Sequence, residues 1–306
     1  MVLALSNMSR RAAFGVVLVL VAAGLVGCGG QAAAPSPVTG RALRVVTTTT
    51  QLSDFARVIG GDQVEVYDVV KANVDPHDYE PTPADVEALR HADLIVKNGI
   101  GLEKWLDGTI ASAGSGATVV DASAGVAVRN GDPHIWQDPN RARTMVENLA
   151  RAMIQADPTD AQAFGEALYR YGAALAALDA EIRAQLAALP DKKLVTNHDA
   201  FAYYAERYGM DIVGSVIPSF DTQAELSSRQ LSALVAKIKA QGVKAVFSEA
   251  SLPPKTAETV AREAGVRIVT GADALYGDTL GPPGSDADTY LKMMRHNTRT
   301  IVTALR

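Results

Sequence analysis

A long amphipathic segment near the middle of the chain, residues 158–189, constrains the fold most strongly. Apolar residues recur in it at steps of three and four, the spacing of one face of an α-helix. They are Phe164, Leu168, Tyr171, Leu175, Leu178, Ile182, Leu186 and Leu189. Asp157 or Thr159 can cap its start, and Pro190 ends it. A helix of about thirty residues would be roughly 45 Å long, so we expect it to connect two domains.

Patterns typical of strands and helices alternate on both sides of this segment, which favours parallel sheets covered by helices. The length of 306 residues allows two domains, and a hydrophobic fraction of 48% with 21% charged residues is typical of folded globular proteins. We therefore predict an α/β fold with two similar lobes, residues 42–157 and 191–306, joined by a helix over 158–190. Ligand sites of such sheets lie off the carboxyl ends of the strands, so we expect a site in the cleft between the lobes.

The amino terminus has the order of an export signal. Arg10 and Arg11 precede an apolar run over residues 12–26 that is short for a bilayer span. Residues 25–28 resemble a bacterial lipobox, in which the cysteine is acylated, and Cys28 is the only cysteine in the chain. The alternative is an ordinary thiol. We predict a signal peptide over 1–27, lipidation at Cys28 and a lipidated tether over 28–41, which would anchor the exported protein to the outer face of the cytoplasmic membrane, in the periplasm or at the cell surface.

The charge balance bears on the kind of partner. The formal net charge is −5, and removal of residues 1–27 takes away two arginines and no acidic residue, which leaves −7. An acidic chain of this kind is not expected to bind nucleic acid. A single cysteine also excludes an internal disulfide.

Two of the five histidines lie in matching Asp-Pro-His motifs, called phrases below. His77 follows Asp75 and Pro76, and His134 follows Asp132 and Pro133, with an aromatic residue two positions after each histidine. Proline fixes its own φ and biases the preceding residue toward an extended conformation, so each phrase presents its histidine from a stiff loop. Stiff loops are suited to metal ligands, although one such histidine alone would be an ordinary hydrogen-bonded loop residue.

A third histidine, His198, follows a predicted strand and opens a predicted helix at Asp199. It is either a third ligand or a cap. His91 and His296 have no matching context, and we interpret both as structural or surface residues. Three neutral imidazoles leave one tetrahedral position for zinc, and a carboxylate is the expected fourth ligand. The candidates are Glu249, Asp273 and Asp278, and periodicity does not choose among them.

An ordered set of motifs runs over nearly the whole chain after the tether. The motifs are VVTTT (45–49), DPH (75–77), EPTP (80–83), NG (98–99), GLE (101–103), DPHIW (132–136), TNHDAF (196–201), SE (248–249) and LYGD (275–278). Together they resemble the zinc- and manganese-binding solute receptors of bacterial ABC transporters. The resemblance implies two α/β lobes joined by a rigid helix, with a metal between them. It also implies His77, His134, His198 and Asp278 as ligands, and Glu249 as a residue that orients a histidine.

The resemblance implies a receptor that captures a metal ion and delivers it to a membrane permease driven by an ATPase. Three nitrogen donors and one oxygen favour Zn²⁺, with Mn²⁺ or Fe²⁺ as the alternative. The first lobe lacks the histidine-rich loop that many zinc receptors carry, which weakens the zinc interpretation. We expect a monomer that is not an enzyme, and metal release by small lobe shifts or by movement of the Asp278 loop.

Three other functions fit parts of the sequence. A zinc hydrolase would need an open coordination position and a general base, and the chain has no helix-borne His-Glu pair of the metalloprotease type. A receptor for a metal chelate such as a siderophore would need a wide basic or aromatic cleft, and aromatic residues make up only 6% of the chain. A surface adhesin is permitted by lipidation but supported by no particular stretch.

Overall fold

The structure is a computed structural model that describes residues 37–224 and 227–306. The predicted signal peptide, the lipidation site Cys28 and most of the predicted tether lie outside these residues. Among the helices that are described, none combines the length and the apolar character needed to cross a membrane.

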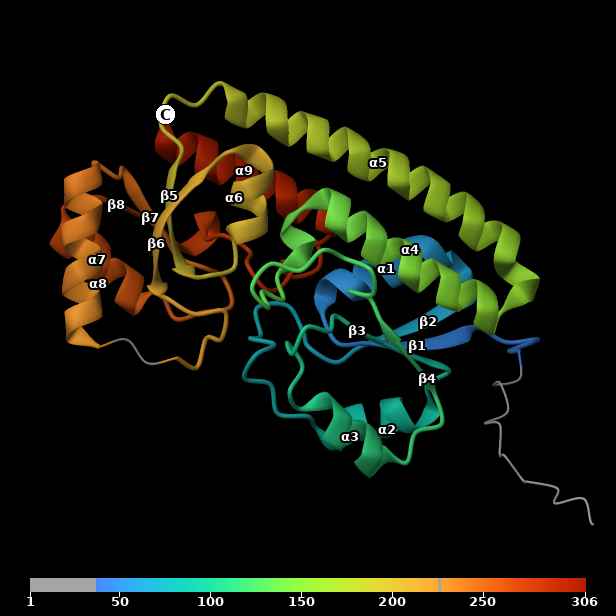
Figure 1. Ribbon diagram of the computed structural model, residues 1–306. Helices are drawn as coiled ribbons and strands as arrows, with labels where there is room; N and C mark the ends of the chain where they lie inside the picture. Colours follow the sequence, from blue (N-terminus) through green and yellow to red (C-terminus); the bar gives the residue numbers. More distant parts are fainter. Residues whose placement is uncertain (1–36, 225–226) are drawn as a thin grey trace, which may run out of the picture. The chain divides into compact units, whose positions relative to one another are not determined.

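A sheet of four parallel strands lies at the centre of the first lobe (Figure 1). Its strand order is β2-β1-β3-β4. The strands are β1 (Leu43–Thr47), β2 (Val64–Asp68), β3 (Leu94–Lys97) and β4 (Thr118–Asp121). Neighbouring residues of β1 face opposite sides, since Val45 packs in one hydrophobic cluster and Val46 in another. Apolar side chains on both faces are typical of a parallel sheet that is covered on both sides.

Helices cover both faces of this sheet. Those of the first lobe are α1 (Thr50–Gly60), α2 (Pro83–His91), α3 (Leu106–Ala113) and α4 (Pro139–Ala156). Helices α1 and α4 pack on one face, and α2 and α3 pack on the other. Asp138 caps the start of α4, and Pro139 occupies its first turn, a preferred position for proline.

The second lobe contains two pairs of parallel strands. They are β5 (Lys193–His198) with β6 (Asp211–Ile217), and β7 (Ala245–Phe247) with β8 (Arg267–Val269). Its helices are α6 (Ala202–Tyr208), α7 (Ser228–Gln241), α8 (Lys255–Ala264) and α9 (Tyr290–Leu305). Helices α7 and α8 pack on one side of these strands, and α6 and α9 pack on the other. The α/β class with mainly parallel strands is therefore confirmed.

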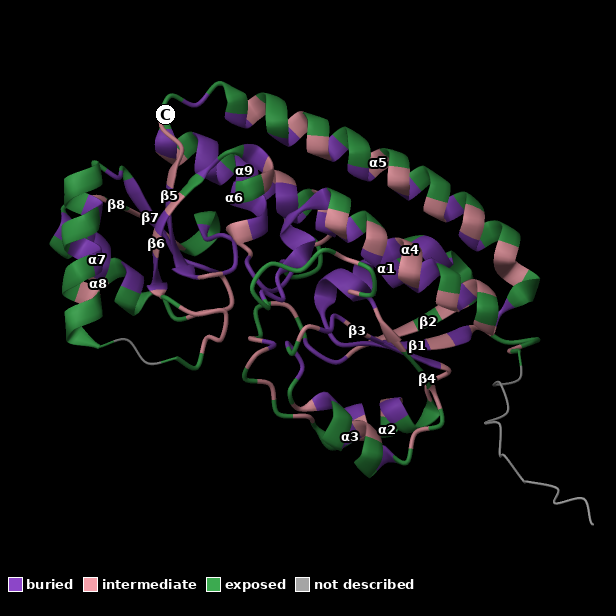
Figure 2. Ribbon diagram, in the orientation of Figure 1, coloured by how far each residue is buried: buried purple, intermediate pink, exposed green. Residues whose placement is uncertain are grey.

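The long helix α5 (Ala161–Ala187) begins three residues later than predicted. Residues Pro158–Asp160 form a short 3₁₀ turn instead, in which the Asp157 side chain accepts a hydrogen bond from the Thr159 backbone. The buried face is the predicted one from Phe164 to Leu186, with Leu168 only half-buried and Ala167 buried beside it. The helix ends at Ala187, before the predicted end, so Leu189 is buried just beyond it. Exposed residues recur along the rest of the helix (Figure 2).

One hydrophobic core continues through both lobes. It contains Phe55 of α1, Leu149 of α4, Leu178 of α5, Tyr204 of α6 and Met294 of α9. Helix α5 contacts α4, α1, α6 and α9, and therefore packs on elements of each lobe. A shared core of this kind resists independent movement of the lobes, because such movement would expose apolar surface.

The last residues of the predicted tether contact the first lobe. The backbone N–H of Val38 donates to the carbonyl of Ala156 at 2.9 Å. Arg41 forms an ion pair with Asp93 at 2.7 Å. The part of the segment that the structure describes is thus attached to the folded lobe rather than free of it.

Candidate metal centre

The four predicted ligands come from loops or strand ends on the same side of the sheets. His77 lies in the loop that follows β2, and His134 precedes the 3₁₀ turn Ile135–Gln137. His198 is the last residue of β5, and Asp278 lies in the loop between β8 and α9. This is the edge at which parallel sheets place their ligands, as the strand pattern predicts.

The first matched phrase forms a tight turn. The backbone N–H of His77 donates to the Asp75 carboxylate at 2.9 Å, and the Trp105 indole donates to the Pro76 carbonyl at 3.3 Å. The ring of Tyr79 packs on Trp105 with 5.2 Å between centroids. The aromatic residue two positions after the histidine therefore anchors this loop by packing on Trp105.

In the second Asp-Pro-His phrase, the aspartate contacts the histidine ring as well as its backbone. One oxygen of Asp132 accepts hydrogen bonds from the backbone N–H of His134 at 3.0 Å and from its ring Nδ1 at 2.7 Å. The amide of Asn98 donates to the Pro133 carbonyl at 3.0 Å. The Trp136 indole donates to the carbonyl of Gly277 at 2.9 Å and thereby connects this turn to the second lobe.

Glu249 holds the third histidine. Its carboxylate accepts from the backbone N–H of His198 at 2.9 Å and lies 2.9 Å from Nδ1 of the same ring. Glu249 thus lies behind His198, away from the other candidate ligands. The predicted helix start at Asp199 is wrong, because residues 199–201 are not helical and α6 begins at Ala202.

Asp278 completes the group. Side chains of the first lobe hold its loop, since the amide of Gln51 donates to the Asp278 carbonyl at 3.0 Å and that of Gln137 donates to the Gly277 carbonyl at 2.7 Å. The Asp278 carboxylate is fully buried. Asp273 is exposed and lies outside this group.

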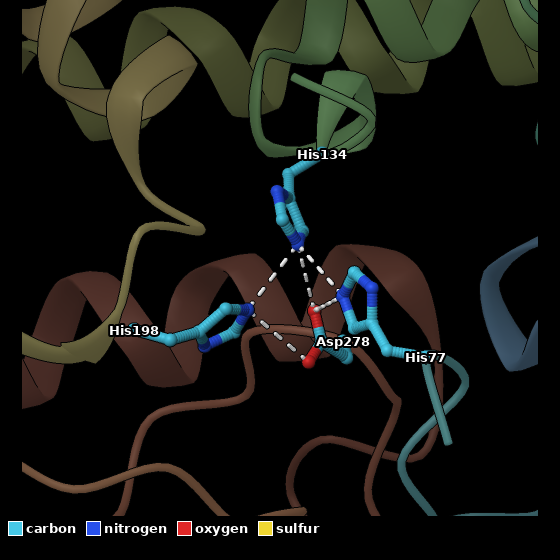
Figure 3. A group of neighbouring side chains, drawn as sticks. All are labelled: His77, His134, His198 and Asp278. Atoms are coloured by element: carbon cyan, nitrogen blue, oxygen red, sulfur yellow. Dashed lines mark hydrogen bonds and ion pairs between the residues drawn. The ribbon is translucent and has the colours of Figure 1, made fainter. Parts of the chain in front are cut away.

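The four side chains point their donor atoms at one another (Figure 3). Nε2 of His134 lies 3.3 Å from Nε2 of His77 and 3.2 Å from Nε2 of His198. The Asp278 carboxylate lies 3.2 Å from His134, 3.4 Å from His198 and 3.9 Å from His77. A tetrahedral zinc ion with bonds of roughly 2.0–2.1 Å would separate its ligands by about 3.3–3.4 Å. Four of the five separations are close to that spacing, and the one between His77 and Asp278 is longer.

The hydrogen bonds behind the rings fix their tautomers. A carboxylate accepts only, so Nδ1 of His134 and Nδ1 of His198 carry the protons that Asp132 and Glu249 accept. In each neutral ring, Nε2 then presents a lone pair to the centre. Neither oxygen of Asp278 has a hydrogen-bond partner among the described residues. Buried lone pairs and an unpartnered carboxylate at these distances require a positive charge between them.

In the absence of a metal ion, protons supply that charge. Burial opposes charging of His198, but the carboxylates of Asp278 and Glu249 outweigh burial and raise its pKa well above the usual histidine value. The pKa of His134 is raised for a similar reason, with Asp132 and Asp278 outweighing burial. Burial would raise the pKa of Asp278, but the neighbouring histidines outweigh it and lower that pKa well below its usual range.

Comparison with known proteins decides the family. A family model described as "Zinc-uptake complex component A periplasmic" matches residues 45–304. The chain belongs to this family. Its members are metal-binding receptor components of ABC transporters, and they are not enzymes. The family suggested by the motifs, and the expectation of a receptor rather than an enzyme, are therefore confirmed.

Relatives of the family differ in the metal that their names state. The manganese-binding lipoprotein MntA of Halalkalibacterium halodurans is 31% identical over 97% of this chain and 99% of the relative. The iron-binding protein YfeA of Yersinia pestis is 30% identical over 86% of each. The solved structure of the periplasmic zinc binding protein TroA from Treponema pallidum is 29% identical and has a TM-score of 0.79, over 87% of this chain and 99% of that one. The family thus establishes metal binding but not which metal.

The two remaining histidines lie outside the group, as predicted. His91 is exposed and pairs with Glu87 on the surface. His296 is buried in α9 and lies between Asp286 and the carbonyl of Ala274.

Sequence reasoning did not identify Asp132 as a partner of the His134 ring. The repeated Asp-Pro-His phrase was the only available indication. That phrase does not distinguish the two acids. Asp132 accepts a hydrogen bond from the ring of His134, whereas Asp75 contacts the backbone N–H of His77 and not its ring. The buried Glu103 was also not predicted to take part; it accepts from the backbone N–H of Asn98 at 2.6 Å and so supports the residue that holds the His134 turn.

Proposed function

We propose that this protein captures a zinc ion outside the cytoplasm through His77, His134, His198 and Asp278 and delivers it to a membrane permease. The observation that carries the proposal is the convergence of three Nε2 atoms and one unpartnered carboxylate at separations close to tetrahedral ligand spacing. Zinc is the transported substrate here, not a resident cofactor.

The donor set favours zinc over harder ions. Neutral imidazole suits zinc, whereas manganese prefers oxygen ligands. Carboxylates behind two of the three imidazoles increase the basicity of those rings and hold them in one orientation. Four protein ligands of this type form a closed tetrahedral site, as structural zinc sites do.

Manganese or iron is the second candidate, and one observation favours it. Both oxygens of Asp278 face the histidines, since Oδ1 lies toward His134 and Oδ2 toward His198. A carboxylate that binds through both oxygens would give five donors, which zinc accepts less readily in a closed site. The names of MntA and YfeA state manganese and iron.

The burial of the site argues against a chelated metal as substrate. The side chains of His134, His198 and Asp278 are completely buried, and that of His77 is 6% exposed. A chelated metal carries its own ligand molecule, which needs an accessible protein surface to bind. Four side chains that are buried to this extent provide no such surface.

We propose that residues 1–27 direct export and that Cys28 carries the lipid that holds the protein at the outer face of the cytoplasmic membrane. Residues 42–157 and 191–306 form the lobes, and residues 158–190 join them. A monomer then docks on the permease, which an ATPase drives from the cytoplasmic side.

Competitive titration of the fragment that starts after Cys28 tests the proposal. The fragment is stripped with a chelator and titrated with zinc, manganese and ferrous iron against a chromophoric competitor. We expect one equivalent of zinc at the highest affinity. His77→Ala and Asp278→Ala should each weaken zinc by well over the roughly 10–100-fold that loss of an outer hydrogen-bond partner costs.

His91→Ala is the matched control, because it removes an exposed histidine outside the site. It should bind zinc like the unaltered protein. Tighter binding of manganese or iron than of zinc would replace the metal in the proposal and keep the site. Zinc binding that is indifferent to both ligand variants would exclude the site itself.

A further inference from the structure

The segment that follows β6 reaches from the second lobe to the first. Beyond Ile217, the ring of Phe220 lies 6.4 Å from that of His134. The next two residues bind the first lobe. The Asp221 carboxylate lies 2.5 Å from the ammonium of Lys104, and the Thr222 hydroxyl donates to the Asp75 carboxylate at 2.6 Å. Residues 220–222 thus pass beside the candidate metal centre and end on the turn that carries a ligand.

Asp75 connects this segment to His77. Its Oδ1 accepts from the backbone N–H of His77 at 2.9 Å, and its Oδ2 accepts from the hydroxyl of Thr222 at 2.6 Å. One carboxylate therefore closes the histidine turn and also receives a hydrogen bond from the opposite lobe. The two contacts use different oxygen atoms, so neither competes with the other.

The orientation of the His77 side chain depends on its backbone turn more than the orientations of His134 and His198 depend on theirs. Rings of His134 and His198 each contact a carboxylate through Nδ1 and are completely buried. Among the described residues, no carboxylate contacts Nδ1 of His77, and its side chain keeps 6% exposure. The direction of the His77 ring is therefore set by the backbone turn that Asp75 stabilises.

The opposite side of the same loop is also tied to the second lobe. The backbone N–H of Asn73 donates to the hydroxyl of Thr279 at 3.1 Å. Contacts at Asn73 and at Asp75 thus hold residues 73–77 between two segments of the second lobe. Of these two contacts, only the hydrogen bond from Thr222 involves the Asp75 carboxylate, which also accepts from the His77 backbone.

We propose that Thr222 is a positioning residue that retains the captured metal by fixing His77 through Asp75. The inference rests on the proposed function, because it takes His77 as a ligand. A cation in a closed four-ligand site leaves only after one ligand turns away. His77 is the ligand with solvent contact and without a carboxylate behind its ring. Loss of the Thr222 hydroxyl frees the Asp75 carboxylate and loosens the turn, so the metal dissociates faster.

Stopped-flow release of zinc to an excess of chromophoric chelator tests this inference. Thr222→Val removes the hydroxyl at nearly constant shape, and Thr222→Ser keeps the hydroxyl and removes the methyl group. A hydrogen bond to a charged group changes an equilibrium constant by about tenfold or more. We expect Thr222→Val to release zinc about tenfold faster, with one equivalent still bound, and Thr222→Ser to release it at nearly the wild-type rate.

Asp221→Asn is the matched control, because it weakens the neighbouring exposed ion pair with Lys104 and leaves the hydroxyl in place. Exposed ion pairs contribute little, so its release rate should be that of the unaltered protein. A wild-type rate for Thr222→Val would overturn the inference, as would equal acceleration in Thr222→Ser or in Asp221→Asn.

Failure of the inference is distinguishable from failure of the proposed function. If Thr222→Val binds one equivalent of zinc and releases it at the wild-type rate, the metal site stands and the role of Thr222 is wrong. If the unaltered protein binds no zinc, manganese or iron, both proposals are wrong.

Discussion

At the scale of single residues, Gly277 shows how closely the candidate centre is built. A Cβ atom at this position would overlap a carboxylate oxygen of Glu249. The Gly277 carbonyl accepts hydrogen bonds from the Trp136 indole and from the Gln137 amide. The glycine therefore lets the Asp278 loop pass against the acid that holds His198.

Glu249 gives the first prediction at this scale. Glu249→Gln keeps the shape and an acceptor oxygen but removes the negative charge behind His198. Loss of such a partner typically weakens metal binding 10–100-fold, so we expect roughly that loss of zinc affinity in competitive titration. The variant Glu263→Gln, on the exposed part of α8, should show no change. Equal affinity of Glu249→Gln and the unaltered protein would contradict the orienting role.

Protonation of the site gives the second prediction. The pKa of His198 is raised in the metal-free protein, so this ring holds a proton above the ordinary histidine value of about 6.5. Zinc must displace that proton, and its affinity should increase as pH rises through the raised value and decrease toward lower pH. Calorimetric titration at pH 7 in two buffers with different ionisation enthalpies should therefore detect proton release. Identical heats in the two buffers would show that no proton leaves.

At the scale of elements, α5 supports both lobes through one apolar face. Leu178 is completely buried in the core that includes residues of α1 and α9. Leu178→Ala should lower the free energy of unfolding by about 2–5 kcal/mol, as large-to-small substitutions in cores do. Because the core is shared, we expect one urea transition observed equally by fluorescence and circular dichroism. Two separated transitions would indicate that the lobes unfold independently.

Tyr169 on the same helix provides the comparison. Its side chain is 82% exposed, so Tyr169→Ala should change the unfolding free energy by no more than about 0.5 kcal/mol. A cost similar to that of Leu178→Ala would mean that the exposed face of α5 has a partner in solution.

The Asp278 loop and the His77 loop differ in their hydrogen bonds to the rest of the protein, and this difference gives a prediction for metal release. The Asp278 loop receives hydrogen bonds from Gln51, Trp136 and Gln137, and the backbone N–H of Leu280 donates to the Thr50 hydroxyl at 2.7 Å. Amide exchange after zinc removal should therefore increase more over residues 71–80 than over residues 275–280. A larger increase over 275–280 would instead support release by movement of the Asp278 loop.

At the scale of the whole molecule, the sequence pattern was sufficient for the architecture. The three-to-four spacing of apolar residues identified α5 and its buried face because a helix face repeats at that spacing. Element ends were less predictable, since local caps decide them. Helix α9, for example, begins at Tyr290 because the Thr289 side chain accepts a hydrogen bond from the backbone N–H of Lys292.

The candidate site was predictable only in part. Stiff Asp-Pro-His loops identified His77 and His134 from the sequence alone, whereas the choice of Asp278 over Glu249 and Asp273 came from family resemblance. Periodicity could not make that choice, because the distinction depends on which acid faces the histidine Nε2 atoms and which lies behind a ring. Such a difference arises from tertiary packing of segments that are far apart in the sequence.

Anomalous X-ray scattering from crystals of the zinc-loaded protein would show whether these four side chains bind the ion. Data collected on both sides of the zinc absorption edge locate the ion independently of the protein chain. We expect one strong peak about 2.0–2.2 Å from Nε2 of His77, His134 and His198 and from a carboxylate oxygen of Asp278. A peak elsewhere, or a peak that one of these four side chains does not contact, would contradict it.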